Sequence, residues 1–155
     1  MLSGVEILKC NGPSNGLCLI YETIEDSNYI FFVCVTAQFL WSCFHEIVGG
    51  SWDHNNFPDL FAELQALPPS SRHIRWLTIG VLAWKLWTIR NKLVIQHVPL
   101  RRATDALFKW SGYLQLWRPL SRPRERDAIT SIITQLRAMA LRLAPPLPPP
   151  PPEPD

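Results

Sequence analysis

The chain has 155 residues, of which 47% are hydrophobic and 18% charged, which is enough material for one domain with a true core. Its longest largely apolar run, residues 30–44, is shorter than the roughly 20 apolar residues of a spanning helix, so we expect no membrane insertion. No signal-peptide pattern opens the chain, so the four cysteines indicate free thiols in a soluble, intracellular protein of the nucleus or cytoplasm, not a secreted disulfide framework.

The formal net charge of +2 conceals an uneven distribution of charge along the chain. Residues 1–66 carry eight acids and one base, whereas residues 67–155 carry fourteen bases and five acids. Halves of opposite sign attract each other within one fold, and a basic half is also typical of proteins that bind nucleic acid. The sequence leaves both interpretations open.

Turn residues and β-branched segments predict a small β-hairpin near the N-terminus. Residues 1–16 include an Asn-Gly-Pro-Ser-Asn-Gly turn sequence and are expected to be poorly ordered. Residues 17–21 and 29–33 have the composition of short strands, which could pair across the acidic turn between them. Two short strands are marginal alone, so the hairpin needs packing or a metal ion to hold it.

The rest of the chain predicts a mainly α fold of about five helices packed on a central, Trp-rich one. Residues 70–97, with Ser70 or Ser71 as the N-cap, are apolar on nearly every face, so this helix should be buried on most sides, Trp84 and Trp87 included. Glycine and proline stops separate the predicted helices, which cover residues 36–48, 58–67, 70–97, 99–117 and 124–143.

Residues 144–155 (APPLPPPPPEPD) form a low-complexity, proline-rich tail. Proline lacks an amide donor and fixes φ, so the tail is expected to be a disordered, solvated polyproline II segment. Such segments fit the aromatic grooves of SH3, WW, EVH1 or profilin-type modules, which makes a polyproline-binding partner one candidate function. The chain is therefore predicted to consist of four regions. They are a poorly ordered N-terminus at residues 1–16, a region at 17–98 that holds the hairpin and the first three helices, a basic helical extension at 99–143, and the tail at 144–155.

The cysteine-bearing segment has the spacing of a metal knuckle in which two ligands are replaced. Cys18, Tyr21, Tyr29 and Cys34 occupy the four positions of a Cys-x2-Cys-x7-His-x4-Cys pattern, which is a tetrahedral zinc site. The stretch LCLIYETIEDSNYIFFVCVTAQFLW resembles the zinc-binding domain that follows the polymerase in plant LINE-type (non-LTR) retrotransposon reverse transcriptases. AWKLWTIRN, at residues 83–91, is similar to the downstream Trp-x2-Trp-x2-Arg-Asn signature, and the resemblance covers residues 16–92.

This resemblance implies an ancestral role in nucleic-acid association beside a polymerase, with zinc as the structural cofactor of the ancestral domain. Cys18 and Cys34 are the retained ligand positions, whereas a neutral phenol at position 21 or 29 is a poor zinc ligand near pH 7. Two thiolates cannot close a four-coordinate site, so we expect no cofactor here and interpret the chain as a degenerate, detached mobile-element fragment. The alternative is buried free thiols beside two tyrosines packed in a hairpin.

Basic residues in the second half are the candidate nucleic-acid contacts, because Arg binds phosphate and the nearby Trp110, Tyr113 and Trp117 can stack on bases. Their alternative role is to form solvated helix faces that partly pair with the acidic half. The histidines and paired carboxylates lack catalytic spacing, and no glycine-rich phosphate loop is present, so no enzyme is predicted. The candidate contacts are Arg101, Arg102, Arg118, Arg122, Arg124 and Arg126.

Overall fold

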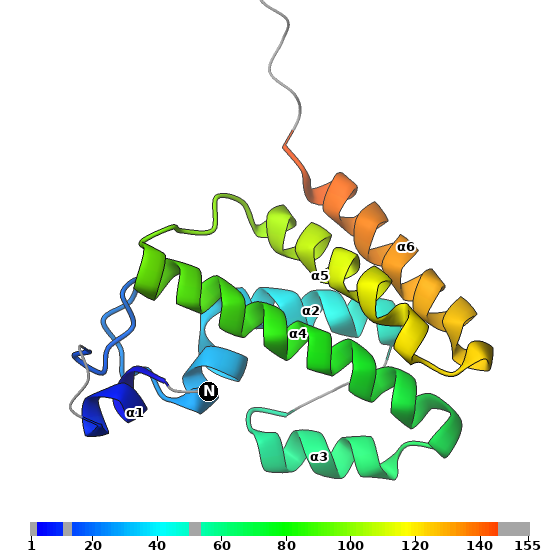
Figure 1. Cartoon of the computed structure of the whole chain (residues 1–155), viewed down its shortest axis with the longest axis horizontal. Helices are drawn as coiled ribbons and strands as arrows, with labels where there is room; N and C mark the ends of the chain where they lie inside the picture. Colours follow the sequence, from blue (N-terminus) through cyan, green and yellow to red (C-terminus); the bar gives the residue numbers. More distant parts are fainter. Residues whose placement is uncertain (1–2, 11–13, 50–53, 146–155) are drawn as a thin grey trace, which may run out of the picture.

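The computed structural model describes residues 3–10, 14–49 and 54–145, and these are mainly α-helical, which confirms the predicted class (Figure 1). The proline-rich tail lies outside the described residues from position 146 onward. In chain order the elements are α1 (Gly4–Lys9), the π-helical turn η1 (Tyr29–Val33), α2 (Val35–Val48), α3 (Phe57–Ala66), α4 (Pro69–Gln96), α5 (Ala103–Trp117), the 3-10 turns η2 (Arg118–Leu120) and η3 (Pro123–Glu125), and α6 (Arg126–Leu143).

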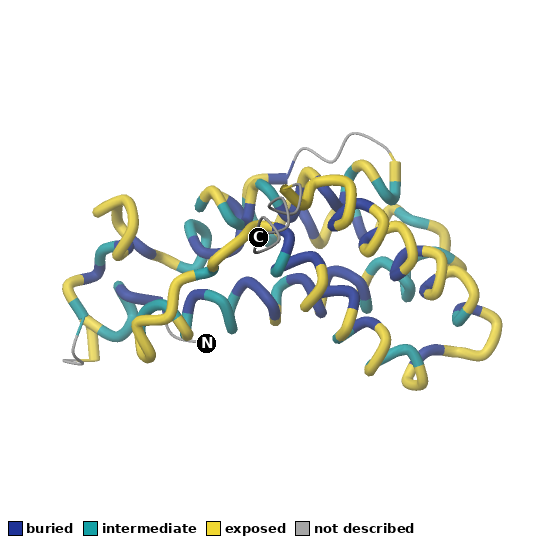
Figure 2. Tube along the Cα trace, turned by 90° about the horizontal axis from the view of Figure 1, so that it is seen from above, coloured by how far each residue is buried: buried dark blue, intermediate teal, exposed yellow. Residues whose placement is uncertain are grey.

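The long helix α4 crosses the molecule, with α5 and α6 on one side, α3 on the other and α2 behind it (Figure 1). Buried and exposed residues alternate along the helices, as expected of elements that each pack on one side (Figure 2). A single apolar cluster forms the core, and η1 and all the helices from α2 to α6 contribute to it. The longest helix contributes to this core, although the most extensive packing between two helices is that of α5 with α6.

Two tryptophans anchor this core through their polar edges as well as their rings. The Trp110 side chain is fully buried, and its Nε1 donates to the Thr78 carbonyl oxygen of α4 at 3.3 Å. Trp41 of α2 donates to the Phe31 carbonyl oxygen at 2.7 Å. A buried indole needs such a partner, so each bond fixes the direction of the helix that carries it.

The predicted β-hairpin is wrong, because Tyr29–Val33 forms a helical turn and not a strand. Within the described residues, the region's β-type pairing is a single isolated bridge between Leu17 and Ile24. Ile30, Phe31 and Phe32 are all buried, whereas the side chains of a strand alternate between its two faces. The wider π-helical turn places all three side chains toward the core, and the Asp26 carboxylate accepts the Tyr29 amide at 2.7 Å where the turn begins.

The start of the chain also differs from the expectation of poor order, since Gly4–Lys9 forms the helix α1. Ser3 and Glu6 make a capping box, in which each side chain accepts the other residue's backbone amide. The Val5 amide then donates to the Glu25 carbonyl oxygen at 3.1 Å. The Ser-x-x-Glu pattern was a readable helix signal that the turn sequence after it obscured.

Two predicted helix starts are displaced in the structure. Helix α4 begins at Pro69, after Pro68, and not under a serine cap, because proline is pre-shaped for a first helical position. Helix α5 begins at Ala103, because Pro99 lies in the extended connection after α4 and not at a helix start. That connection follows His97, whose backbone is left-handed at φ 53° and ends α4.

Helix α4 is not buried on nearly every side, and of the two tryptophans predicted to be buried only Trp87 packs against the core. Trp84 is 38% exposed and Trp87 is half-buried. The buried face instead carries Lys85 and Arg90 among its aliphatic residues. Long basic side chains can cover apolar surface with their methylene stems, so residue type alone did not identify the inward face.

The acidic and basic halves pair with each other, as one interpretation of the charge distribution required. Glu25 and Arg90 form an ion pair in which both side chains are buried. Glu46 of α2 and Arg142 of α6 form another at 2.6 Å, with both side chains more than half exposed. Solvent screens the second pair, so only the first holds the fold strongly.

Replacing Glu25 by Ala should therefore destabilise the protein by about 3–5 kcal/mol, because the charge of Arg90 would remain buried without its partner. The matched change Glu46→Ala should cost at most about 1 kcal/mol. Urea unfolding followed by far-ultraviolet circular dichroism measures both. Equal losses from the two variants would contradict this ranking.

Candidate functional site

A cavity of about 200 Å³ lies where the segment before α2 meets the C-terminal half of α4. Cys18, Tyr21, Tyr29 and Cys34, the four positions with the spacing of a metal knuckle, all line it. The structure thus brings together residues spread over seventeen positions of the sequence. The rest of the lining is mostly apolar and includes Ile20, Ile30, Val35, Leu86, Leu93 and Leu100.

Cys34 has a structural role in this cavity as the N-cap of α2. Its Sγ accepts the Ala37 amide at 3.4 Å and donates to the Ile30 carbonyl oxygen at 3.5 Å. Burial raises the pKa of the Cys34 thiol, although hydrogen bonds from the amides of Ala37 and Thr36 oppose the rise. A raised pKa disfavours the thiolate that zinc requires.

The two tyrosines complete a donor set that does not fit zinc. Burial raises the pKa of the Tyr29 phenol; Thr23 opposes this by hydrogen bonding, and the thiols of Cys18 and Cys34 add to the rise. Tyr21 lies at the rim with half of its surface exposed. Two thiols and two neutral phenols cannot hold a structural zinc ion, and the described residues contain no group of three or more His, Cys, Asp or Glu placed to hold a metal.

The Glu25–Arg90 ion pair also lines the cavity. Glu25 Oε1 accepts Arg90 Nε at 3.0 Å and Nη2 at 2.5 Å, and it accepts the Gly4 amide at 3.0 Å as well. The Arg90 guanidinium lies 5.6 Å from the centre of the Trp87 ring. The pair therefore joins the cysteine-bearing loop to the Trp-x2-Trp-x2-Arg-Asn segment, the two sequence features that carry the resemblance.

The structure does not bring the candidate arginines together. Arg101 and Arg102 precede α5 and the Arg118–Arg126 group follows it, so about 22 Å of helix separates them (Figure 1). Arg118 Nη1 donates to Thr130 Oγ1 at 2.8 Å, and Arg126 Nη2 donates to the Pro119 carbonyl oxygen at 3.4 Å. The exposed members, to which a ligand would have access, are Arg101, Arg102, Arg122 and Arg124.

A buried lysine between α4 and α5 is a feature that sequence reasoning passed over. Lys85 of α4 is only 4% exposed, and its Nζ lies 3.3 Å from the centre of the Tyr113 ring of α5. Burial, and then the charges of Lys109 and Lys92, lower the pKa of Lys85 to about 8. The sequence did contain a signal for this buried lysine. Lys85 stands between Trp84 and Leu86, in a helix that has five Lys or Arg residues and no Asp or Glu.

Two histidines pair with carboxylates, although their sequence spacing showed no such pairing. His54 Nδ1 lies 2.9 Å from Glu63 Oε2 of α3, and its ring packs edge-on against Trp41. His73 Nδ1 of α4 lies 2.7 Å from Glu125 Oε2, which ties α4 to the start of α6. These pairs link helices and do not form a recognisable catalytic group.

Desolvation raises the pKa of the buried Glu125 carboxyl, but hydrogen bonds from the His73 ring and the Arg122 amide outweigh it and leave the pKa lowered. A lowered native pKa stabilises the fold above the unfolded value of 4.5, and the gain is lost as the pH falls through the native value. Glu125→Gln should therefore lower Tm at pH 7 and have little effect at pH 3, as measured by thermal denaturation. A deficit that persists at pH 3 would contradict this assignment.

Fold and site together define a mainly helical protein with a largely apolar cavity, a buried ion pair and a buried lysine that lies over a tyrosine ring. Comparisons with protein-family models, with curated proteins and with solved structures gave no match. Among the described helices, none is both long enough and apolar enough to cross a membrane.

Proposed function

We propose that the chain is a non-catalytic nucleic-acid-binding domain derived from the zinc-binding domain of a mobile-element reverse transcriptase. The observation that carries the proposal is the cavity, because the four positions with knuckle spacing line one space. The second half of the resemblance contributes Arg90, which binds the knuckle loop through Glu25. Residues that once shared an ion would remain neighbours in this way after two of them had changed.

Unpaired cations on the surface support the nucleic-acid role. The described ion pairs leave exposed Lys and Arg side chains without an acidic partner, and a phosphate backbone binds such groups through charge and counterion release. Trp117, which is partly exposed next to Arg118, can stack on an unpaired base, whereas Trp110 is fully buried and cannot. Single-stranded nucleic acid is therefore the favoured ligand.

Restoring the replaced donors tests the origin of the cavity. The double variant Tyr21→Cys/Tyr29→His should bind about one zinc ion per chain, because it completes a Cys3His set around the existing space. Mass spectrometry of the purified protein gives the stoichiometry, and added zinc should raise Tm in the double variant only. The triple variant that also carries Cys18→Ser is the control and should lose most of the affinity.

A double variant that binds no zinc would show that the knuckle alignment is wrong. Tight zinc binding by the unmodified chain would contradict the loss of the donor set. The two failures are distinct, since the first concerns ancestry and the second concerns the present chemistry of the cavity.

The nucleic-acid role predicts binding that is strongly dependent on salt and nearly independent of sequence. If three phosphates are neutralised, raising the salt from 50 to 200 mM should weaken single-strand binding about 20-fold. Fluorescence anisotropy of labelled oligonucleotides of different sequence measures this. Absence of binding at 50 mM salt, or tight binding that ignores salt, would refute the role.

A further inference from the structure

We infer that the cavity between the segment before α2 and the C-terminal half of α4 is a binding site for a small, uncharged aromatic molecule that carries one N–H or O–H group. The site is independent of the nucleic-acid function proposed above, because it depends on the present shape and polarity of the cavity and not on its ancestry.

The size of the cavity fits a molecule of one or two rings. Its volume is about 200 Å³. Apolar protein cavities of about 150 Å³ stay dry and bind benzene, because water finds too few polar partners in them. A single or fused aromatic ring is therefore the size of molecule that this space admits.

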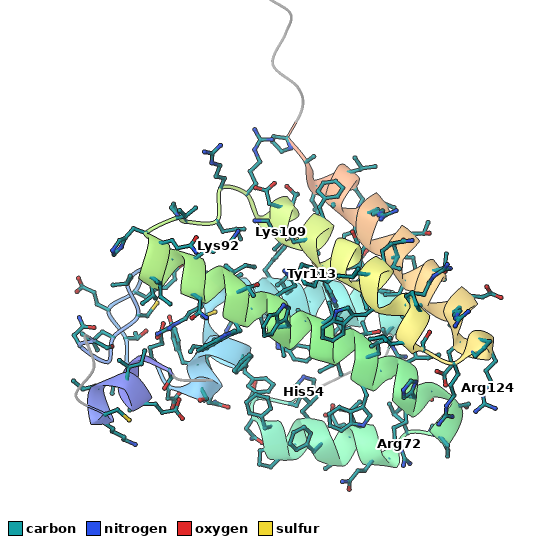
Figure 3. All side chains as sticks on the ribbon, viewed as in Figure 1. His54, Arg72, Lys92, Lys109, Tyr113 and Arg124 are labelled. Atoms are coloured by element: carbon teal, nitrogen blue, oxygen red, sulfur yellow. The ribbon has the colours of Figure 1, made fainter. Side chains whose placement is uncertain are left out.

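The walls of the cavity are mostly aliphatic and come from separate parts of the chain. Leu86, Ile89 and Leu93 follow one another at spacings of three and four residues, so they share one face of α4. Lys92, labelled in Figure 3, marks the end of α4 to which this face belongs. Pro99 adds a wall from the extended connection after α4. Apolar walls favour an apolar ligand, since binding removes apolar surface of both partners from water.

The cavity has a mouth that solvent reaches. Ile20, Tyr21 and Val35 line the cavity, yet each of these side chains is more than half exposed. Residues that border a cavity and also meet solvent lie at its entrance. Large apolar side chains exposed together at one place are typical of a ligand-binding surface.

The polar edge of the cavity offers a hydrogen-bond acceptor. Glu25 Oε1 accepts both bonds from Arg90 and the bond from the Gly4 amide, whereas the described residues donate no hydrogen bond to Oε2. Although Glu25 is only 3% exposed, Oε2 is not among the fully buried polar atoms that lack a partner, so part of its surface is open. Because Glu25 lines the cavity, Oε2 is the acceptor for an N–H or O–H group of the ligand.

The same pair of residues disfavours a charged ligand. Glu25 and Arg90 neutralise each other, and the lining around them is largely apolar. An anion would compete with Glu25 for Arg90, and a cation would compete with Arg90 for Glu25. Either ion would also lose its hydration, which costs more than a neutral donor loses.

Three small probes, added to the full-length chain, test the size and the polarity of the site. Indole has two fused rings, no charge and one N–H group; benzofuran has the same shape with an oxygen in place of the N–H; benzoate is charged. In titrations followed by methyl NMR, indole should bind with a Kd of about 1 mM or tighter. Benzofuran should bind about tenfold more weakly, because it cannot donate to Oε2. Benzoate should not bind detectably.

The unmodified chain also reveals where the probe binds. Indole should shift the methyl signals of Leu86, Ile89 and Leu93, which line the cavity. The methyl signals of Leu116 on α5 and Leu141 on α6, both 68% exposed and outside the cavity, should stay in place. This measurement needs no variant and so does not depend on how a substitution affects folding.

A variant that fills the cavity supplies the second test. Leu93→Trp should place a ring in the space and weaken indole binding about tenfold or more, with circular dichroism as the check on folding. Leu141→Trp makes the same exchange at an exposed position on α6 and is the matched control. It should leave indole binding unchanged.

Each outcome concerns the cavity and leaves the nucleic-acid role to the oligonucleotide titration. No indole binding at about 5 mM, shifts confined to methyl groups outside the cavity, or unchanged affinity in a folded Leu93→Trp variant would overturn the site. Benzoate that binds more tightly than indole would overturn the choice of an uncharged ligand. Equal affinities for indole and benzofuran would contradict the role of Glu25 Oε2.

Discussion

The fold depends on one buried ion pair between residues 65 positions apart in the chain, Glu25 and Arg90. A single carboxylate oxygen accepts two bonds from the guanidinium of α4 and one from the Gly4 amide at the start of α1. These bonds offset the cost of removing both charges from water, and they bring the N-terminal segment onto the long helix. Both residues of the pair also line the cavity.

Aromatic packing anchors the turn η1, whose Tyr29 and Ile30 line the cavity. Phe32 stacks on Trp41 with ring centres 5.8 Å apart, and it meets Phe57 edge-on at 4.9 Å. Cys34 is the cap of α2: its sulfur accepts the Ala37 amide, and its bond to the Ile30 carbonyl oxygen needs the thiol hydrogen. Under the proposed ancestry, side-chain contacts of this kind have taken over the stabilising role of the ion.

On helix α4 the polarity of a residue does not indicate whether it is buried. Two of its tryptophans, Trp76 and Trp84, are partly exposed, while Lys85 and Arg90 are buried. Arg90 pairs with the Glu25 carboxylate, whereas the Lys85 ammonium lies over the Tyr113 ring, about 140° round the helix from Arg90. The burial of a residue on α4 therefore follows from the partner that its side chain contacts and not from its polarity.

The sequence by itself determined the helical class, the approximate bounds of five helices, the opposite charges of the two halves and the grouping of Cys18 with Cys34. Local signals such as proline stops and apolar periodicity carry this information, because they act over a few residues. Only the tertiary structure decided that Tyr29–Val33 turns as a helix, that Lys85 faces inward, and that Arg101 lies far from Arg122. Those outcomes depend on which surfaces meet across the fold, since the energy of burying a side chain is set by distant neighbours that no local pattern specifies.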